Sequence, residues 1–225
     1  NFDFVASDTG ILENSDFSSD LIDSWDIITH PNGLNNITGN YTGGIAIEDE
    51  KLKTAFHTRN GSAAYNWAYV HTAYQAIDVS DTDYLDISAL GAADNITISD
   101  KTIPGTLRFG LSTQIPESNY TNNTNTSNAT AALYTSNNIN TSIFDLVTFS
   151  GETSYVEWVA TTSGTTTSTE ELLRVDVTDQ TTVYAVIVSF IDTSTLGSSS
   201  TYYTRGTGPA AKANSIDDIV VTKAE

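Results

Sequence analysis

The sequence predicts an all-β domain, a sandwich of two antiparallel sheets. Short segments of alternating apolar and polar residues recur along the chain, at the spacing typical of sandwiches and barrels. The 225 residues include 35 Thr, 24 Ser and 18 Asn, which favour strands and turns. Few segments have helical periodicity. At this length one sandwich domain is the default organisation.

The predicted strands follow one another along the whole chain. The clearest is 67–77, because it alternates large side chains on one face over eleven residues. Three polar stretches are expected to be loops: 119–130, 160–169 and 193–214. In chain order the predicted strands are 24–29, 44–48, 52–58, 67–77, 84–89, 107–114, 131–135, 144–149, 154–160, 172–177, 183–191 and 215–222.

The charge balance excludes some partners. There are 28 acidic residues against 9 basic ones, and the formal net charge is −19. Nucleic acid and anionic membranes are disfavoured, because both need clustered Lys and Arg. No apolar run approaches the length of a membrane span, and no Cys is available for disulfides or thiolate sites. We expect a secreted, extracellular or cell-surface protein whose leader has been removed, with cations or neutral polymers as possible partners.

The N-terminus has the pattern of a strand. Phe2, Phe4 and Ala6 alternate with Asp3, Val5 and Ser7 in a place where chain ends usually fray. The segment is either the first strand of the chain's own sheet or a donor strand for a neighbouring copy. We divide the chain into an N-terminal arm, 1–10, and a sandwich domain, 11–225.

Motifs near both ends resemble the carbohydrate-binding-module jelly roll, the galactose-binding-like sandwich. The first motif is Asn-Ser-Asp-Phe-Ser at 14–18, followed by Trp25, and the last is Ile-Asp-Asp-Ile-Val-Val at 216–221. Segments 76–80 and 84–88 are similar to a strand pair of that family. The resemblance implies a jelly roll over 11–225.

The same resemblance implies a structural calcium ion between the first and last strands. Asp217 matches the family's aspartate, Asp218 follows it, and Asp16 lies in the N-terminal motif, but Ser18 replaces a family glutamate. Calcium needs about 6–8 oxygen ligands, so these groups and backbone carbonyls would supply part of the shell. A second acidic run, from Asp78 to Asp86, is either another cation site or a solvated turn.

Exposed aromatic side chains would be needed to stack on sugars. Trp67 and Tyr69 share a predicted strand face, and Trp158 could lie beside them. Tyr202 and Tyr203 lie in a loop, where exposure is expected. The alternative is that the tryptophans are core residues, because large aromatics dominate core burial.

No catalytic constellation is present. The three histidines have no metal-ligand spacing, and there is no Gly-x-Ser-x-Gly elbow. The acidic pairs do not match a glycosidase arrangement. We therefore expect no enzyme activity.

Nine Asn-x-Ser/Thr sequons suit a glycosylated, secreted protein. They are Asn36, Asn40, Asn60, Asn95, Asn119, Asn122, Asn125, Asn128 and Asn140.

Two hypotheses follow for the function. The first is an extracellular structural protein, a subunit that polymerises with copies of itself into a filament or sheath through donor-strand contacts. The second is a carbohydrate-binding module or adhesin that recognises a polysaccharide. The N-terminal arm favours the first hypothesis, and the terminal motifs favour the second.

Overall fold

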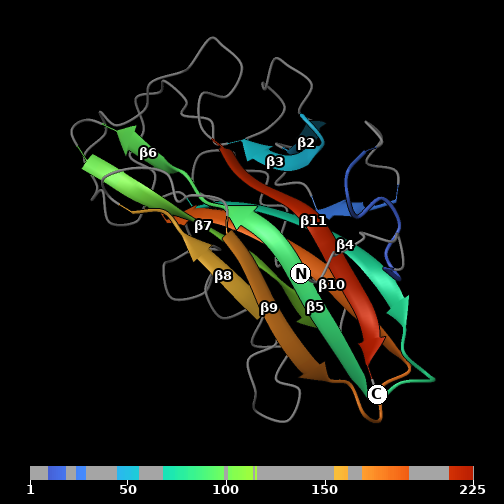
Figure 1. The fold of residues 1–225 in the computed structure, drawn as a ribbon. Helices are drawn as coiled ribbons and strands as arrows, with labels where there is room; N and C mark the ends of the chain where they lie inside the picture. Colours follow the sequence, from blue (N-terminus) through green and yellow to red (C-terminus); the bar gives the residue numbers. More distant parts are fainter. Residues whose placement is uncertain are drawn as a thin grey trace, which may run out of the picture.

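The computed structural model describes residues 10–18, 24–28, 45–55, 68–98, 101–113, 115, 155–161, 169–192 and 213–224. All regular elements in these ranges are strands (Figure 1). They are β1 (Asp26–Ile28), β2 (Ile45–Glu48), β3 (Lys51–Ala55), β4 (Ala68–Asp78), β5 (Tyr84–Ala92), β6 (Asn95–Ile98), β7 (Lys101–Ser112), β8 (Tyr155–Val159), β9 (Thr169–Asp176), β10 (Thr182–Asp192) and β11 (Ala213–Ala224).

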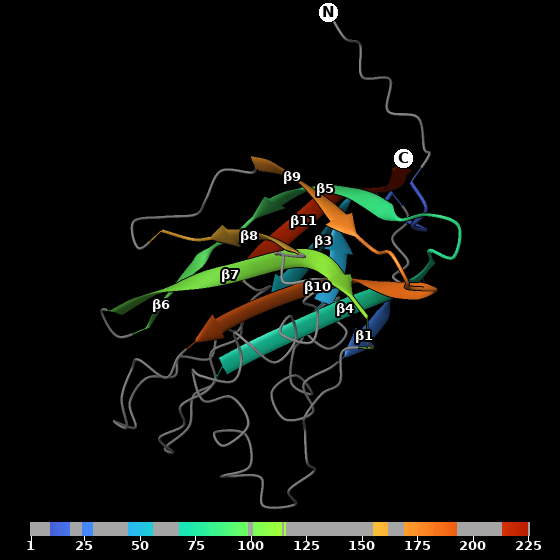
Figure 2. The ribbon, with the colours of Figure 1, turned by 90° about the horizontal axis from the view of Figure 1, so that it is seen from below.

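The strands form two antiparallel sheets that lie face to face (Figure 2). The six-stranded sheet has the order β1-β4-β10-β7, with β6 and β8 pairing with successive halves of β7. The five-stranded sheet has the order β2-β3-β11-β5-β9. The chain crosses repeatedly between the sheets, as from β4 to β5 and from β9 to β10. The predicted jelly-roll β-sandwich is therefore confirmed.

The core lies between the sheets and follows from side-chain alternation. In β5, Leu85, Ile87 and Ala89 point inward and are buried, whereas the residues between them face solvent in part. Phe109 of β7 and Ile187 of β10 face them from the other sheet, both almost fully buried. Burying a large apolar side chain contributes about 1.5–3 kcal/mol, so this layer dominates the stability of the fold.

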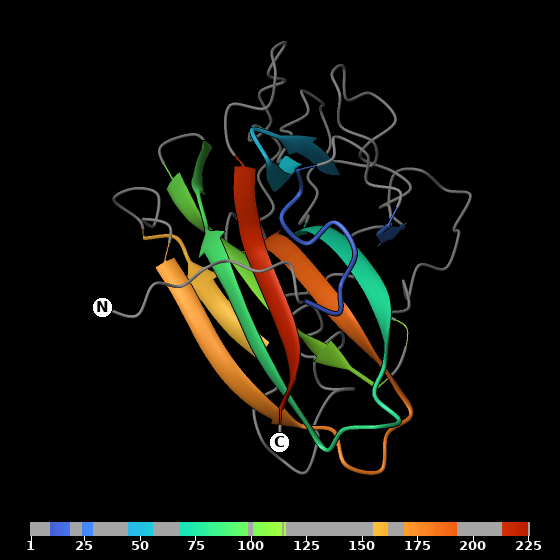
Figure 3. The same cartoon turned by 45° about the vertical axis from the view of Figure 1, so that its right-hand side comes forward.

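The N-terminal segment, residues 10–18, completes the five-stranded sheet. β3 pairs only with the beginning of β11, from Ala213 to Ile216. Beyond that point the N–H of Ile219 donates to the carbonyl of Ser15 (3.1 Å), and the N–H of Ile11 donates to the carbonyl of Val221 (3.0 Å). The segment thus lies beside the second half of β11 (Figure 3).

Most predicted strands are present, with shifted ends. β7 begins at Lys101, six residues before the predicted start, and its partner β6 was not predicted at all. The predicted strands 131–135 and 144–149 lie outside the described residues. No helix in the described part of the chain is long and apolar enough to cross a membrane.

Candidate functional site

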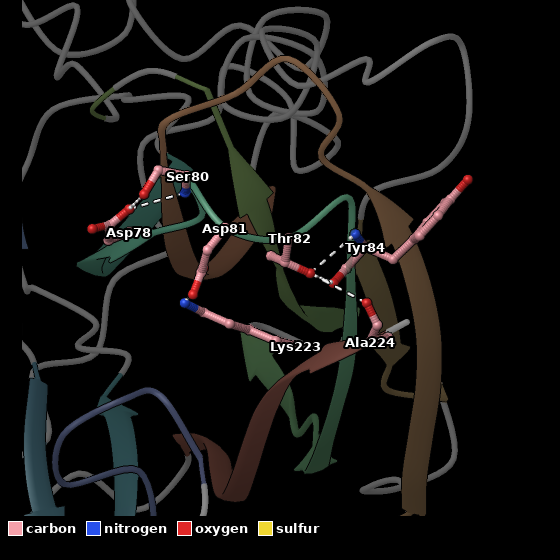
Figure 4. Close-up of polar contacts among 7 residues, drawn as sticks. All are labelled: Asp78, Ser80, Asp81, Thr82, Tyr84, Lys223 and Ala224. Atoms are coloured by element: carbon pink, nitrogen blue, oxygen red, sulfur yellow. Dashed lines mark hydrogen bonds and ion pairs between the residues drawn. The ribbon is translucent and has the colours of Figure 1, made fainter.

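One end of the sandwich carries a polar depression of about 500 Å3, called here the turn pocket (Figure 4). Two tight turns and the end of the last strand build it. The β4–β5 turn, the β9–β10 turn and Ala224 supply the wall. The lining residues are Val79, Ser80, Asp81, Thr82, Asp83, Tyr84, Asp179, Gln180, Thr181 and Ala224.

Backbone hydrogen bonds hold the two turns together. The N–H of Val79 donates to the carbonyl of Thr181 (3.1 Å), and the N–H of Val177 donates to the carbonyl of Asp83 (2.8 Å). The hydroxyl of Thr82 lies 2.9 Å from the carbonyl of Tyr84 and 3.2 Å from that of Ala224. Both turns and the β11 end therefore form one fixed frame.

Side-chain contacts fix the polar groups of the β4–β5 turn. The carboxylate of Asp78 accepts hydrogen bonds from the N–H and the hydroxyl of Ser80, at 2.9 and 2.7 Å. These bonds favour the charged carboxylate and lower the pKa of Asp78. Asp81 and Lys223 point toward one another and form an ion pair (Figure 4).

The turn pocket offers free acceptors and one aromatic ring. The carboxylates of Asp83 and Asp179 are exposed, and neither has a side-chain partner among the residues that the structure describes. Tyr84 is 37% exposed, and its side chain points away from the other labelled residues (Figure 4). Gln180 and Thr181 add groups that both donate and accept. This set can hydrogen-bond vicinal hydroxyls and pack against an apolar sugar face.

The acidic run from Asp78 to Asp86 does not act as one cluster. Asp86 lies on the outer face of the five-stranded sheet, where Arg174 of β9 donates two hydrogen bonds to its carboxylate, at 2.6 and 2.7 Å. These bonds lower the pKa of Asp86. Only Asp81 and Asp83 of this run line the turn pocket.

The lowered pKa of Asp86 predicts a pH effect on stability. A carboxylate whose pKa is lower in the folded state stabilises the fold above its unfolded pKa of about 3.9, and this contribution disappears as the pH falls through the folded value. Asp86→Asn should therefore reduce the loss of thermal stability between neutral pH and pH values below about 4. Melting curves across this range test it, and parallel curves for both proteins would contradict it.

The predicted calcium ligands lie at the junction of β11 and the N-terminal segment, but they do not converge. The carboxylate of Asp217 lies 3.4 Å from Nζ of Lys51, and the carboxylate of Asp16 accepts the N–H of Ser18 (3.1 Å). Across the described ranges, no three carboxylate or histidine side chains are grouped to hold a metal ion, so Asp218 does not complete a site either. Calcium binding stays a prediction.

The predicted sugar-stacking residues are not brought together. Trp158 is 3% exposed and belongs to the core, so its assignment to a sugar site is corrected. The reason is its place in β8, where it follows the inward-facing Val156 by two residues. Trp67, Tyr202 and Tyr203 lie outside the described residues, as does the side chain of Tyr69 in β4.

Other predicted sites are described only in part. The donor-strand residues Phe2, Phe4 and Ala6 lie outside the described residues, as do eight of the nine sequons. The ninth, Asn95, is 7% exposed, and its Nδ2 donates to the carbonyl of Thr161 (2.9 Å). Its amide nitrogen is thus engaged inside the fold, and a glycan is not expected on it.

A second tyrosine pair lies on the outer face of the six-stranded sheet. Tyr74 and Tyr184 meet edge to face with ring centroids 6.1 Å apart, and burial and the charge of Asp26 raise the pKa of Tyr74. Val186 and Val188 point the same way, away from the core, yet both are buried. The middle of this face is therefore not an open binding surface, and the turn pocket is the better candidate.

Sequence reasoning missed the turn pocket. It lies at the ends of strands that were predicted, but nothing in the sequence places the β4–β5 turn beside the β9–β10 turn. The available signal was two Asp-rich turns, 78–84 and 176–182, each directly next to a long apolar strand.

No family model matches the chain, and no curated protein matches it. Three solved structures are similar in fold. TmCBM61 in complex with β-1,4-galactotriose is 8% identical with a TM-score of 0.37, and the match covers 96% of this chain and 99% of that one. A CBM4 structure is 13% identical with a TM-score of 0.41, covering 95% and 99%. The enzymatically active domain of bacteriophage CBA120 tailspike protein 4 is 12% identical with a TM-score of 0.42, covering 96% of this chain and 22% of that one.

Proposed function

We propose that this chain is a carbohydrate-binding domain, and that it binds a neutral glycan in the turn pocket. The observation that carries the proposal is the combination, at one depression, of two carboxylates without a side-chain partner in the described part of the chain, hydroxyls, an amide and an exposed tyrosine. Sugar recognition needs acceptors for hydroxyl groups and a flat apolar surface, and this pocket offers both.

The charge of the pocket supports a neutral ligand. Asp81, Asp83 and Asp179 line it, and its neighbouring cation, Lys223, is already paired with Asp81. A uronate or a sulfated sugar would meet uncompensated negative charge in a protein whose net charge is −19. Polysaccharides without charged groups meet no such repulsion.

Binding without cleavage is the proposed role. Asp83 and Asp179 are exposed to solvent. Glycoside hydrolases instead keep their acid protonated in apolar surroundings. The filament hypothesis depends on residues 1–9, which lie outside the described residues, so the described contacts do not support it.

Removing single pocket groups should weaken glycan retention. We expect Asp83→Asn, Asp179→Asn or Tyr84→Ala each to reduce affinity by roughly 10-fold or more, because each removes a charge-assisted hydrogen bond or a stacking surface. Affinity electrophoresis through gels that contain xylan, galactan, mannan or mixed-linkage glucan measures this, together with pull-down on cellulose and chitin.

Matched changes outside the pocket provide the controls. Glu170→Gln removes an exposed carboxylate and Leu172→Ala removes an exposed apolar side chain, both on β9. These variants should migrate like the wild type in gels that contain a neutral polysaccharide. Gels that contain the charged polysaccharides pectate or alginate should retard neither the wild type nor these variants. If no neutral polysaccharide retards the wild type, or if the pocket variants are retarded as strongly as the controls, the proposal is wrong.

A further inference from the structure

We infer that the ammonium group of Lys51 is the resident cation at the junction of β3, β11 and the N-terminal segment, and that this junction folds without calcium. Lys51 Nζ lies 3.4 Å from Asp217 Oδ2. The Asp217 side chain is only 16% exposed and that of Lys51 is 33% exposed, so the pair is partly shielded from water.

The backbone explains why these two groups meet. Lys51 is the first residue of β3, and its neighbour Leu52 pairs with Ile216 of β11. The next position along β11 is Asp217, where the register with β5 shifts in a bulge. Lys51 therefore stands opposite Asp217 at the point where the pairing of β3 with β11 stops and the N-terminal segment lies beside β11 instead.

Asp217 needs a cationic partner at this place. The pKa of its carboxyl group is raised, first by its partial burial and also by the charge of Asp218, although the N–H of Asp218 and the charge of Lys51 oppose this shift. The N–H of Asp218 donates to Oδ1 at 2.8 Å. The second oxygen faces Lys51, so both carboxylate oxygens have partners without a metal ion.

A calcium ion does not fit the same carboxylate. It would lie about 2.3–2.6 Å from an oxygen. On Oδ2 it would therefore come within about 6 Å of Lys51 Nζ, and the two positive charges would repel each other. One oxygen of Asp16 accepts the N–H of Ser18, and a hydroxyl stands at position 18 where the family that the terminal motifs resemble has a carboxylate, so one carboxylate ligand is missing.

Thermal unfolding with and without calcium tests the inference. The wild type should melt at the same temperature in millimolar calcium chloride and in EDTA, and calcium alone should give no binding heat by isothermal titration calorimetry. Lys51→Met, which keeps the length of the side chain and removes the charge, should lower the melting temperature by roughly 2–4 °C.

Lys53→Met is the matched control, because Lys53 lies on the same strand but pairs with Asp49 and Glu48, whose side chains are 83% and 35% exposed and so less buried than Asp217. It should melt close to the wild type. In the double variant Lys51→Met/Asp217→Asn the buried charge is gone, so part of the lost stability should return. Calcium that raises the melting temperature of the wild type would overturn the inference, as would a Lys51→Met variant no less stable than Lys53→Met.

Discussion

Replacing Gly91 by alanine is expected to destabilise the fold strongly, because the added methyl group would clash with a buried indole ring. A Cβ at this position would lie 2.3–2.5 Å from three ring atoms of Trp158. The indole lies flat on the glycine from the opposite sheet and is almost fully buried, so it cannot swing into solvent. Overpacking of this kind costs about 1–3 kcal/mol and occasionally more. Equilibrium urea unfolding should show a lower midpoint with an unchanged slope.

Gly10 offers the control for this substitution. A Cβ on Gly10 would meet its nearest atoms at 3.9–4.0 Å, which is ordinary van der Waals contact. Gly10→Ala should therefore unfold within about 0.5 kcal/mol of the wild type, as surface changes usually do. Trp158→Phe should also remove part of the clash, so that the double variant with Gly91→Ala loses less than the sum of the single losses. Equal stability of Gly91→Ala and Gly10→Ala would contradict the packing that the structure describes.

The contact between Gly91 and Trp158 shows where sequence reasoning stops. Alternation of apolar residues located β4, β5, β10 and β11, because a buried face imposes a period of two on any strand. The same rule identified Trp158 as a residue of a strand face, but it could not decide between core and surface. That decision depends on which strand of the other sheet lies opposite, and a glycine there leaves the space for the indole.

The candidate site was less predictable than the fold. The sequence drew attention to aromatic residues at strand positions, whereas the described pocket is built from turns that are distant in the chain. Asp83 and Asp179 are separated by 96 positions, and the antiparallel pairings of β4 with β10 and of β5 with β9 bring their turns together. Long-range pairing of this kind leaves no local pattern in a single sequence. The terminal motifs predicted the fold class without predicting the ligand, as expected where many functions share one fold.

The β6–β7 hairpin was missed for a similar reason. Pro104 and Gly105 interrupt the apolar pattern there, and both residues weaken a strand prediction. In the structure Gly105 allows a close approach, because a Cβ would lie 2.4 Å from the carbonyl oxygen of Asp94. The N–H of Gly105 donates to that same carbonyl (2.9 Å), so the position is used for tertiary contact.

The second large effect is expected at Asn214, the centre of a buried polar network between the sheets. Its Nδ2 donates to the carbonyl of Thr106 (2.9 Å) and to the hydroxyl of Ser189 (2.8 Å), and its Oδ1 accepts the N–H of Asp94 (2.8 Å). Asn214 and Ser189 are fully buried. Asn214→Leu keeps much of the volume but leaves all three partners without this amide. Each unsatisfied buried group costs about 1–3 kcal/mol, and Ser189 keeps its contact with Thr54, so the loss at the other two partners should reach roughly 2–6 kcal/mol.

Thr54→Val distinguishes the effect of lost hydrogen bonds from the effect of changed side-chain volume. It removes one hydroxyl from the same cluster and leaves the volume nearly unchanged. That hydroxyl lies 2.6 Å from Ser189 Oγ, which keeps its bond to Asn214 when Thr54 is replaced. Thr54→Val should therefore cost only about 1 kcal/mol. Because Asn214 joins β11 of one sheet to β7 and β10 of the other, its loss should also speed exchange of the Asp94 amide proton. A loss of stability in Asn214→Leu no larger than in Thr54→Val, with unchanged amide exchange, would mean that apolar packing alone aligns the two sheets.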